Sequence, residues 1–153
     1  MDWFEIYTMR RRDIFGLVLT SGLAGCSSVL QSDTRLGGIL ISNGDDSHHE
    51  IDVEVGKDEE TVYSAVYQLD PPEEDTADAE TVDCEWPIDS GHFVIRARTQ
   101  QSDWVSIDLS EEDDGDCHQV HVSIPPEFSD NPTLAADLCR DEDSEWLCNS
   151  IEF

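Results

Sequence analysis

Basic residues are scarce in this sequence. Aspartate and glutamate number 36 against 8 lysine and arginine residues, Lys57 is the only lysine, and the formal net charge at pH 7 is −28. A surface this negative lacks the cationic patches that hold nucleic-acid phosphates, so we expect no nucleic-acid partner. Charge so far from zero also weakens a compact state by self-repulsion, which salt screens.

Long hydrophobic runs and catalytic motifs are missing as well. The apolar segment 14–24 is shorter than the roughly 20 residues that a helix needs to cross a bilayer. No Gly-x-Ser-x-Gly, His-Glu-x-x-His or phosphate-cradling glycine loop occurs. The sequence therefore predicts neither a transmembrane helix nor an enzyme, and it indicates no cofactor.

Residues 9–26 have the layout of an export signal. Three consecutive arginines, Arg10 to Arg12, precede the apolar segment, as a positive region precedes the hydrophobic core of a signal peptide. Arg11-Arg12-Asp13-Ile14-Phe15 resembles the twin-arginine export motif. Leu23-Ala24-Gly25-Cys26 resembles the lipobox, in which cleavage before the cysteine frees its thiol for lipid attachment.

We expect residues 1–25 to be removed as a signal peptide, with Met9 as an alternative start to Met1. Residues 26–35 should then form a lipidated polar tether. A tether of this length spans at most about 30 Å. The folded body should therefore sit close to the membrane.

The acidic composition, the near absence of lysine and this signal together resemble haloarchaeal surface lipoproteins exported through the twin-arginine route. The resemblance implies a protein held by lipid on Cys26 at the extracellular face of the cell membrane, in a salty environment. We expect two partners, the membrane through this lipid and a protein at the cell surface.

Seven short segments alternate apolar and polar residues and are separated by turn signals. In the clearest, Ile51, Val53 and Val55 alternate with acids, which places apolar side chains on one face. The segments are residues 36–42, 49–55, 61–69, 81–86, 92–99, 104–109 and 117–124.

This pattern predicts an all-β domain over residues 36–124, an antiparallel seven-stranded β-sandwich, with an antiparallel β-barrel as the alternative. Order and spacing resemble the immunoglobulin-like domains of haloarchaeal lipoproteins. Residues 125–153 should form a short disulfide-clipped appendage, in which Thr133 to Cys139 is helix-like but too short to be a stable helix alone.

Five cysteines occur, and assigning Cys26 to lipid leaves an even set. Four cysteines in an exported protein indicate two disulfides, with three connectivities open. We expect Cys84 to pair with Cys117, and Cys139 with Cys148, because the second pair closes a local loop.

The strand pattern conflicts with part of this pairing. Cys84 shares the parity of the apolar residues Val82 and Trp86, but Cys117 falls on the opposite parity from Val120. Cys117 should therefore lie at a strand edge, in a loop or at a bulge.

A copper centre is the sharpest alternative chemistry. Cys117 and His121 have a Cys-x-x-x-His spacing, and His49 or His92 could supply a second nitrogen for a blue-copper site. Removal of the signal discards both methionines, so no axial methionine would remain. An even set of cysteines is better explained by disulfides.

Other metals have weaker signals. The adjacent pair His48-His49, and His118 with His121, are candidate zinc ligands, and the acidic segments 43–46 and 111–116 are candidate calcium loops. Neither acidic segment has the spaced ligands of a dedicated loop. We expect no metal site and interpret both segments as solvated acidic surface.

These observations favour a lipid-anchored β-sandwich with a non-catalytic binding or scaffolding role at the cell surface. The two alternatives are a small blue-copper-type electron carrier and an accessory subunit of an exported membrane complex.

Overall fold

A computed structural model describes residues 33–74, 76–126, 131–140 and 147–148. In chain order its elements are β1 (Arg35–Asn43), β2 (His49–Lys57), β3 (Glu60–Leu69), β4 (Asp78–Thr81), β5 (Phe93–Thr99), β6 (Val105–Asp108), the 3-10 helix η1 (Leu109–Glu111), β7 (Cys117–Ile124) and β8 (Thr133–Leu138).

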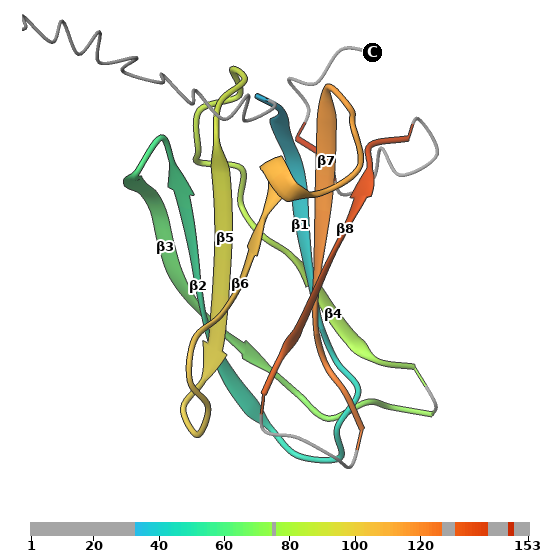
Figure 1. Ribbon diagram of the computed structural model, residues 1–153. Helices are drawn as coiled ribbons and strands as arrows, with labels where there is room; N and C mark the ends of the chain where they lie inside the picture. The colour runs from blue at the N-terminus through green and yellow to red at the C-terminus, as the bar shows by residue number, and fades with distance from the viewer. Residues whose placement is uncertain (1–32, 75, 127–130, 141–146, 149–153) are drawn as a thin grey trace, which may run out of the picture.

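The strands form two four-stranded sheets that pack face to face (Figure 1). One sheet has the order β4-β1-β7-β8 and the other the order β3-β2-β5-β6. The predicted β-sandwich is therefore confirmed, although the described residues contain eight named strands and the sequence predicted seven.

The core lies between the two sheets because the strands alternate. Ile51, Val53 and Val55 of β2 are fully buried, as are Ile39 and Ile41 of β1. Each such side chain contributes about 1.5 to 3 kcal/mol by leaving water. The residues between them face outward and are largely polar, so one face of each sheet is left to solvent.

The sheet that contains β1 is mixed, which corrects the expectation of purely antiparallel strands. β1 pairs in parallel with β7, from Arg35 opposite Cys117 to Asn43 opposite Ile124. Parallel neighbours need a long connection, which these two strands have because most of the domain lies between them in sequence. Local alternation carries no information on this pairing.

The predicted helix-like stretch at Thr133 to Cys139 is instead strand β8. β8 pairs antiparallel with β7, and Leu134 and Ala136 pack against the core. Six residues are too few for a stable helix, whereas their alternation suits the open edge of β7. The sandwich therefore extends beyond residue 124 to include Thr133–Leu138, which the sequence assigned to the appendage.

Two predicted boundaries also change. Thr34 is buried and forms a bridge with Gly91, and Arg35 begins β1, so the predicted tether 26–35 ends inside the fold. The predicted strand 81–86 lies at Asp78–Thr81, and the chain beyond it crosses toward the second sheet without strand pairing. Cys26, Arg11, Arg12 and the lipobox lie outside the described residues.

The expected disulfide connectivity is wrong. Cys84 is bonded to Cys148, and Cys117 to Cys139. Cys117 begins β7, and Cys139 directly follows β8. The two face the same side, because the antiparallel register that pairs His118 with Leu138 places Cys139 opposite Cys117. Gly37 lies against this bond, where an added Cβ would be 2.7 Å from the Cys117 Sγ atom.

The turn between β2 and β3 stores backbone strain. Asp58 and Glu59 both have positive φ, 50° and 70°, as in the two-residue hairpin turns that usually contain glycine. Asp58 is held there because its carboxylate accepts a hydrogen bond from the His92 amide at 2.9 Å.

Replacing Glu59 by glycine should relieve part of this strain. A left-handed conformation costs a non-glycine residue about 1 to 2 kcal/mol, and glycine's entropy offsets part of the gain, so we expect Glu59→Gly to stabilise the fold by up to about 1 kcal/mol. Urea denaturation measures it. The matched control Glu60→Gly lies inside β3 and should destabilise; a loss of stability in both variants would contradict the strain.

Candidate functional site

The outer face of the β3-β2-β5-β6 sheet carries a ladder of ion pairs. Asp52 and Glu54 project from β2 beside Arg98 and Arg96 of β5, as the register pairs them. The Arg98 Nε atom donates to Asp52 at 2.7 Å, and the Arg96 Nε atom donates to Glu54 at 2.6 Å. Alternation on two antiparallel strands thus brings opposite charges together across the sheet.

Trp104, one residue before β6, covers both arginines. Its ring centroid lies 4.6 Å from the guanidinium carbon of Arg96 and 4.5 Å from that of Arg98. Such cation–π contacts contribute about 0.5 to 1 kcal/mol each at exposed sites. We call Asp52, Glu54, Arg96, Arg98 and Trp104 the arginine–tryptophan face.

This face is electrically unusual in so acidic a chain. Two arginines and two carboxylates balance on it, so its own residues carry no net charge. Among the described residues the other lysine and arginine side chains are dispersed. Lys57 is buried and paired with Asp89 at 2.6 Å, the Arg35 Nε atom donates to the carbonyl of Asp116, and Arg140 lines a hollow with Glu112 and Asp137. The face is therefore a locally neutral patch on an acidic surface.

The face continues to the edge of the sheet at Val66. Val66 of β3 is paired in register with Asp52, and 56% of it is exposed, more than any other large hydrophobic residue described. Ile88 and Leu138, the next most exposed, lie outside this sheet. An apolar side chain, a tryptophan and two held guanidinium groups therefore share one surface.

A tyrosine pair supports β3 from its inner side. The hydroxyl groups of Tyr63 and Tyr67 are 2.6 Å apart, and the Tyr63 ring meets Trp86 edge to face at 5.6 Å. Burial, with the hydrogen bond to Tyr67, raises the pKa of Tyr63 well above its usual value. The Tyr63 phenol therefore stays neutral, and the pair connects β3 to the chain that follows β4 through Trp86 and the Asp83 amide.

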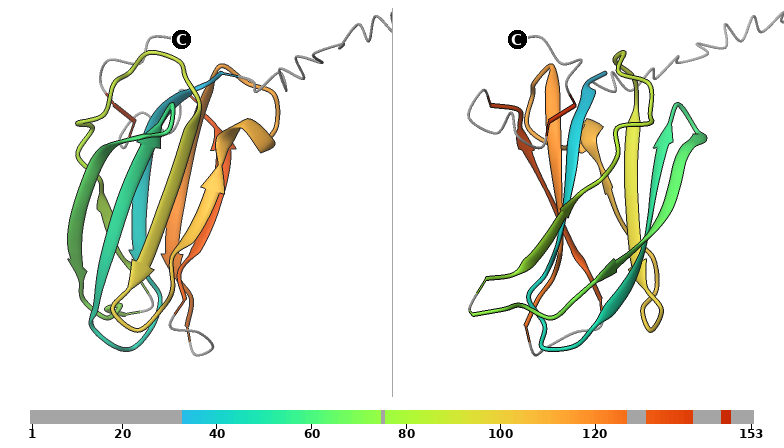
Figure 2. Two further views of the ribbon diagram at one scale, coloured as in Figure 1. Left: turned by 60° about the vertical axis from the view of Figure 1, so that its left-hand side comes forward. Right: turned by 180° about the vertical axis from the view of Figure 1, so that it is seen from behind.

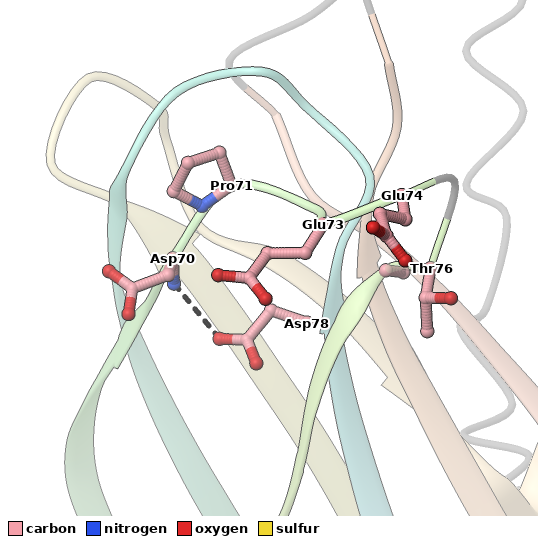
Figure 3. A pocket seen from close by; sticks show the side chains of 7 residues that line it. Asp70, Pro71, Glu73, Glu74, Thr76 and Asp78 are labelled. Carbon is pink, nitrogen blue, oxygen red and sulfur yellow. Dashed lines mark hydrogen bonds between the residues drawn. The ribbon is translucent and has the colours of Figure 1, made fainter.

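Carboxylates surround a hollow at each end of β3. In the loop that follows β3, a hollow is lined by Asp70, Glu73, Glu74 and Asp78, and the Asp70 amide donates to Asp78 at 2.9 Å (Figure 3). At the start of β3, a second hollow is lined by Glu54, Glu59 and Glu60 beside Arg96. An acidic cluster is not by itself a binding site. What these hollows establish is that carboxylates lie at both ends of β3.

The structure disperses the histidines that were candidate ligands. Each histidine forms hydrogen bonds with different residues. His48 bonds with Asp70, His49 with Asp45, His92 with Asp108, His118 with Thr34 and the Asp113 carbonyl, and His121 with Ser42. Within the described part of the chain, no three or more His, Cys, Asp or Glu residues come together as a metal-binding group.

A copper centre built on Cys117 is incompatible with this structure. The Cys117 sulfur is bonded to Cys139, so it has no thiolate to offer a metal. His92 is held elsewhere by Asp108: burial favours the neutral acid, but hydrogen bonds from His92 and Ser110 outweigh it and lower the pKa of Asp108. In the candidate calcium segment 43–46, the Asn43 side chain donates to the carbonyls of Ser47 and Asp70 and accepts from the Asp45 amide.

His121 should make stability depend on pH. Burial lowers its pKa, although Asp137 acts in the opposite direction, so the folded state resists protonation. The unfolded chain binds that proton more readily below pH 6.5, and the free energy of unfolding should fall as the pH falls from about 7 to 5. Urea denaturation of wild type and His121→Gln measures this; equal pH slopes would contradict it.

No protein-family model and no curated protein matches this sequence. Of the residues described, none form a helix long and apolar enough to span a membrane. The functional argument therefore rests on the arginine–tryptophan face. Sequence patterns place Arg96 and Arg98 outward on one strand, but they do not show that Asp52, Glu54 and Trp104 meet them there, because the strand register is not local information.

Proposed function

We propose that this chain is a lipid-anchored, non-catalytic binding or scaffolding protein at the outer face of the cell membrane, and that its arginine–tryptophan face binds a protein partner. The single observation that carries the binding role is Trp104 held against Arg96 and Arg98, on the same sheet face as the exposed Val66. Tryptophan and arginine are the residues most enriched where binding energy concentrates in protein interfaces.

The location rests on the export signal and on Cys26. Replacing Cys26 by serine removes the thiol for lipid attachment, so we expect the variant to leave the membrane fraction and appear in the medium. Immunoblotting of cell fractions measures this. Retention of Cys26→Ser in the membrane at the level of wild type would contradict the anchor.

The binding role is tested by co-purification from detergent-solubilised membranes in high salt. We expect wild type to retain a stoichiometric partner that Trp104→Ala loses, with affinity falling roughly thirtyfold, as for truncation of an interface hot spot. Ile88→Ala is the matched control, because Ile88 is also an exposed apolar residue, 44% accessible, but lies outside the face.

Circular dichroism should show that both variants are folded. A partner retained equally by Trp104→Ala and wild type would contradict binding through this face. A partner that belongs to a multi-subunit membrane complex would make this chain its accessory subunit.

A further inference from the structure

The four edge strands of the sandwich differ in how they are protected. Proteins guard exposed edges against further pairing by keeping them short or by placing charges on them. β4 and β6 have four residues each, β4 carries Asp78 and Glu80, and β8 carries Asp137. β3 has ten residues, and its nine positions from Thr61 to Leu69 carry no charge.

The edge of β3 is open along its length. β3 lies at the margin of its sheet (Figures 1 and 2), and among the described residues β2 is its only backbone partner. The chain after β4 reaches β3 through side chains, as where the Asp83 amide meets the Tyr67 hydroxyl at 3.4 Å. Ser64, Val66 and Gln68 are exposed.

We propose that the free edge of β3 binds an extended segment of a partner protein as a fifth strand of the β3-β2-β5-β6 sheet, and that this segment carries lysine or arginine at both ends. The inference deepens the proposed binding role by naming the kind of partner, and it does not depend on the membrane anchor.

The partner segment must be extended because it would pair with β3 through backbone hydrogen bonds. Ten residues of β3 span about 33 Å and present alternate N–H and C=O groups along the open side. Thr61, Val62 and Val66 are residues that favour strands, and the tyrosine pair holds β3 in place, so little ordering is needed before binding. Val66 then offers an apolar contact to the side chains of the added strand.

The acidic residues at both ends of β3 favour basic residues at both ends of the partner segment. Asp58, Glu59 and Glu60 stand at one end of β3, and the hollow with Asp70, Glu73, Glu74 and Asp78 stands at the other (Figure 3). A second copy of this chain in antiparallel pairing would bring these acids together, which opposes self-association. A strand with an uncharged centre and basic ends has the complementary pattern.

The test uses the folded chain and a synthetic peptide, acetyl-Lys-Lys-Thr-Val-Thr-Val-Thr-Lys-Lys-amide. NMR spectra of the isotopically labelled protein should show shifts in β3, with slower hydrogen exchange of its outward amides. Two control peptides separate the contributions: one has glutamate in place of lysine, and the other is N-methylated at every central residue. Neither should produce these changes.

A charge variant tests the flanks. Replacing Glu59, Glu60, Glu73 and Glu74 by glutamine should weaken the lysine-flanked peptide roughly tenfold, since each exposed ion pair contributes little and the effects add. Equal binding of the N-methylated peptide, or shifts on another edge, would overturn strand addition. Sedimentation of the free chain as a dimer through β3 would overturn the choice of partner.

The two proposals fail differently. If the peptide leaves β3 unchanged while Trp104→Ala still loses its partner, strand addition is wrong and the arginine–tryptophan face stands. If the peptide binds β3 but Trp104→Ala keeps its partner, the edge stands and the face is wrong.

Discussion

Replacing Cys84 and Cys148 together by serine should lower the free energy of unfolding by about 4 kcal/mol. The bond joins residues 64 apart in sequence, and closing so long a loop removes much conformational freedom from the unfolded chain. It also fixes the segment whose Cys148 amide donates to the Gly37 carbonyl of β1 at 2.7 Å, with Leu147 buried beside it. Urea denaturation in high salt, followed by circular dichroism, measures the change.

The second disulfide provides the control. Cys117 and Cys139 are 22 apart, so their double replacement by serine should cost less, about 3 kcal/mol. Peptide mapping of the unreduced protein should find Cys84 linked to Cys148. A loss from the first variant of only about 0.5 kcal/mol, as for an ordinary surface substitution, or a Cys84–Cys117 peptide, would contradict the structure.

Trp86→Ala should cost about 3 to 5 kcal/mol, as truncation of a large buried aromatic residue does. Only 3% of Trp86 is exposed, its ring packs edge to face on Tyr63, and its Nε1 atom donates to the Leu36 carbonyl at 3.0 Å. The residue thus joins β1 of one sheet to β3 of the other. Denaturation monitored by circular dichroism avoids the loss of the Trp86 fluorescence signal.

Trp86→Phe separates the two contributions. Phenylalanine keeps an aromatic ring against Tyr63 but cannot donate to the Leu36 carbonyl. We therefore expect Trp86→Phe to lower the free energy of unfolding by roughly 1 to 2 kcal/mol relative to wild type. A loss in Trp86→Ala no greater than in Trp86→Phe would show that ring packing contributes little, contrary to the structure.

The sequence predicts the sandwich well because alternation is local. The strands at β1, β2, β3, β5 and β7 follow from apolar residues at every second position, and burial confirms those faces. β8 is missed because Leu134-Ala135-Ala136-Asp137-Leu138 has helix-favouring residues, and only the open edge of β7 selects a strand there.

That one error also explains the wrong disulfides. The outward parity of Cys117 is a correct signal against its pairing with Cys84. The inward parity expected of Cys84 is itself wrong, because Cys84 is exposed and lies beyond the end of β4. Once Thr133–Leu138 is a strand beside β7, Cys139 lies on the same outward side as Cys117, and Cys84 is left for Cys148. Local patterns carry this information only after the strand order is known.

The candidate site depends still more on strand order. The alternation in residues 92–99 places Arg96 and Arg98 on the face opposite the apolar one, and the structure finds Trp104 half-buried. The pairing of Arg96 with Glu54 and of Arg98 with Asp52 joins residues 42 and 46 apart in sequence. The contact of Trp104 with both arginines depends on how the chain between β5 and β6 turns. One sequence signal could have pointed to this site. Lysine and arginine are scarce in the chain, so two arginines on one strand are unusual.

Amide hydrogen exchange on the protein bound to its co-purified partner tests the central claim most directly. Binding through the arginine–tryptophan face and the β3 edge predicts slower exchange, relative to the free protein, in β3, β5 and the residues around Trp104. Exchange in β1, β7 and β8 should be unchanged. Protection confined to the β4-β1-β7-β8 sheet, or no partner that alters exchange in β3 and β5, would contradict the account.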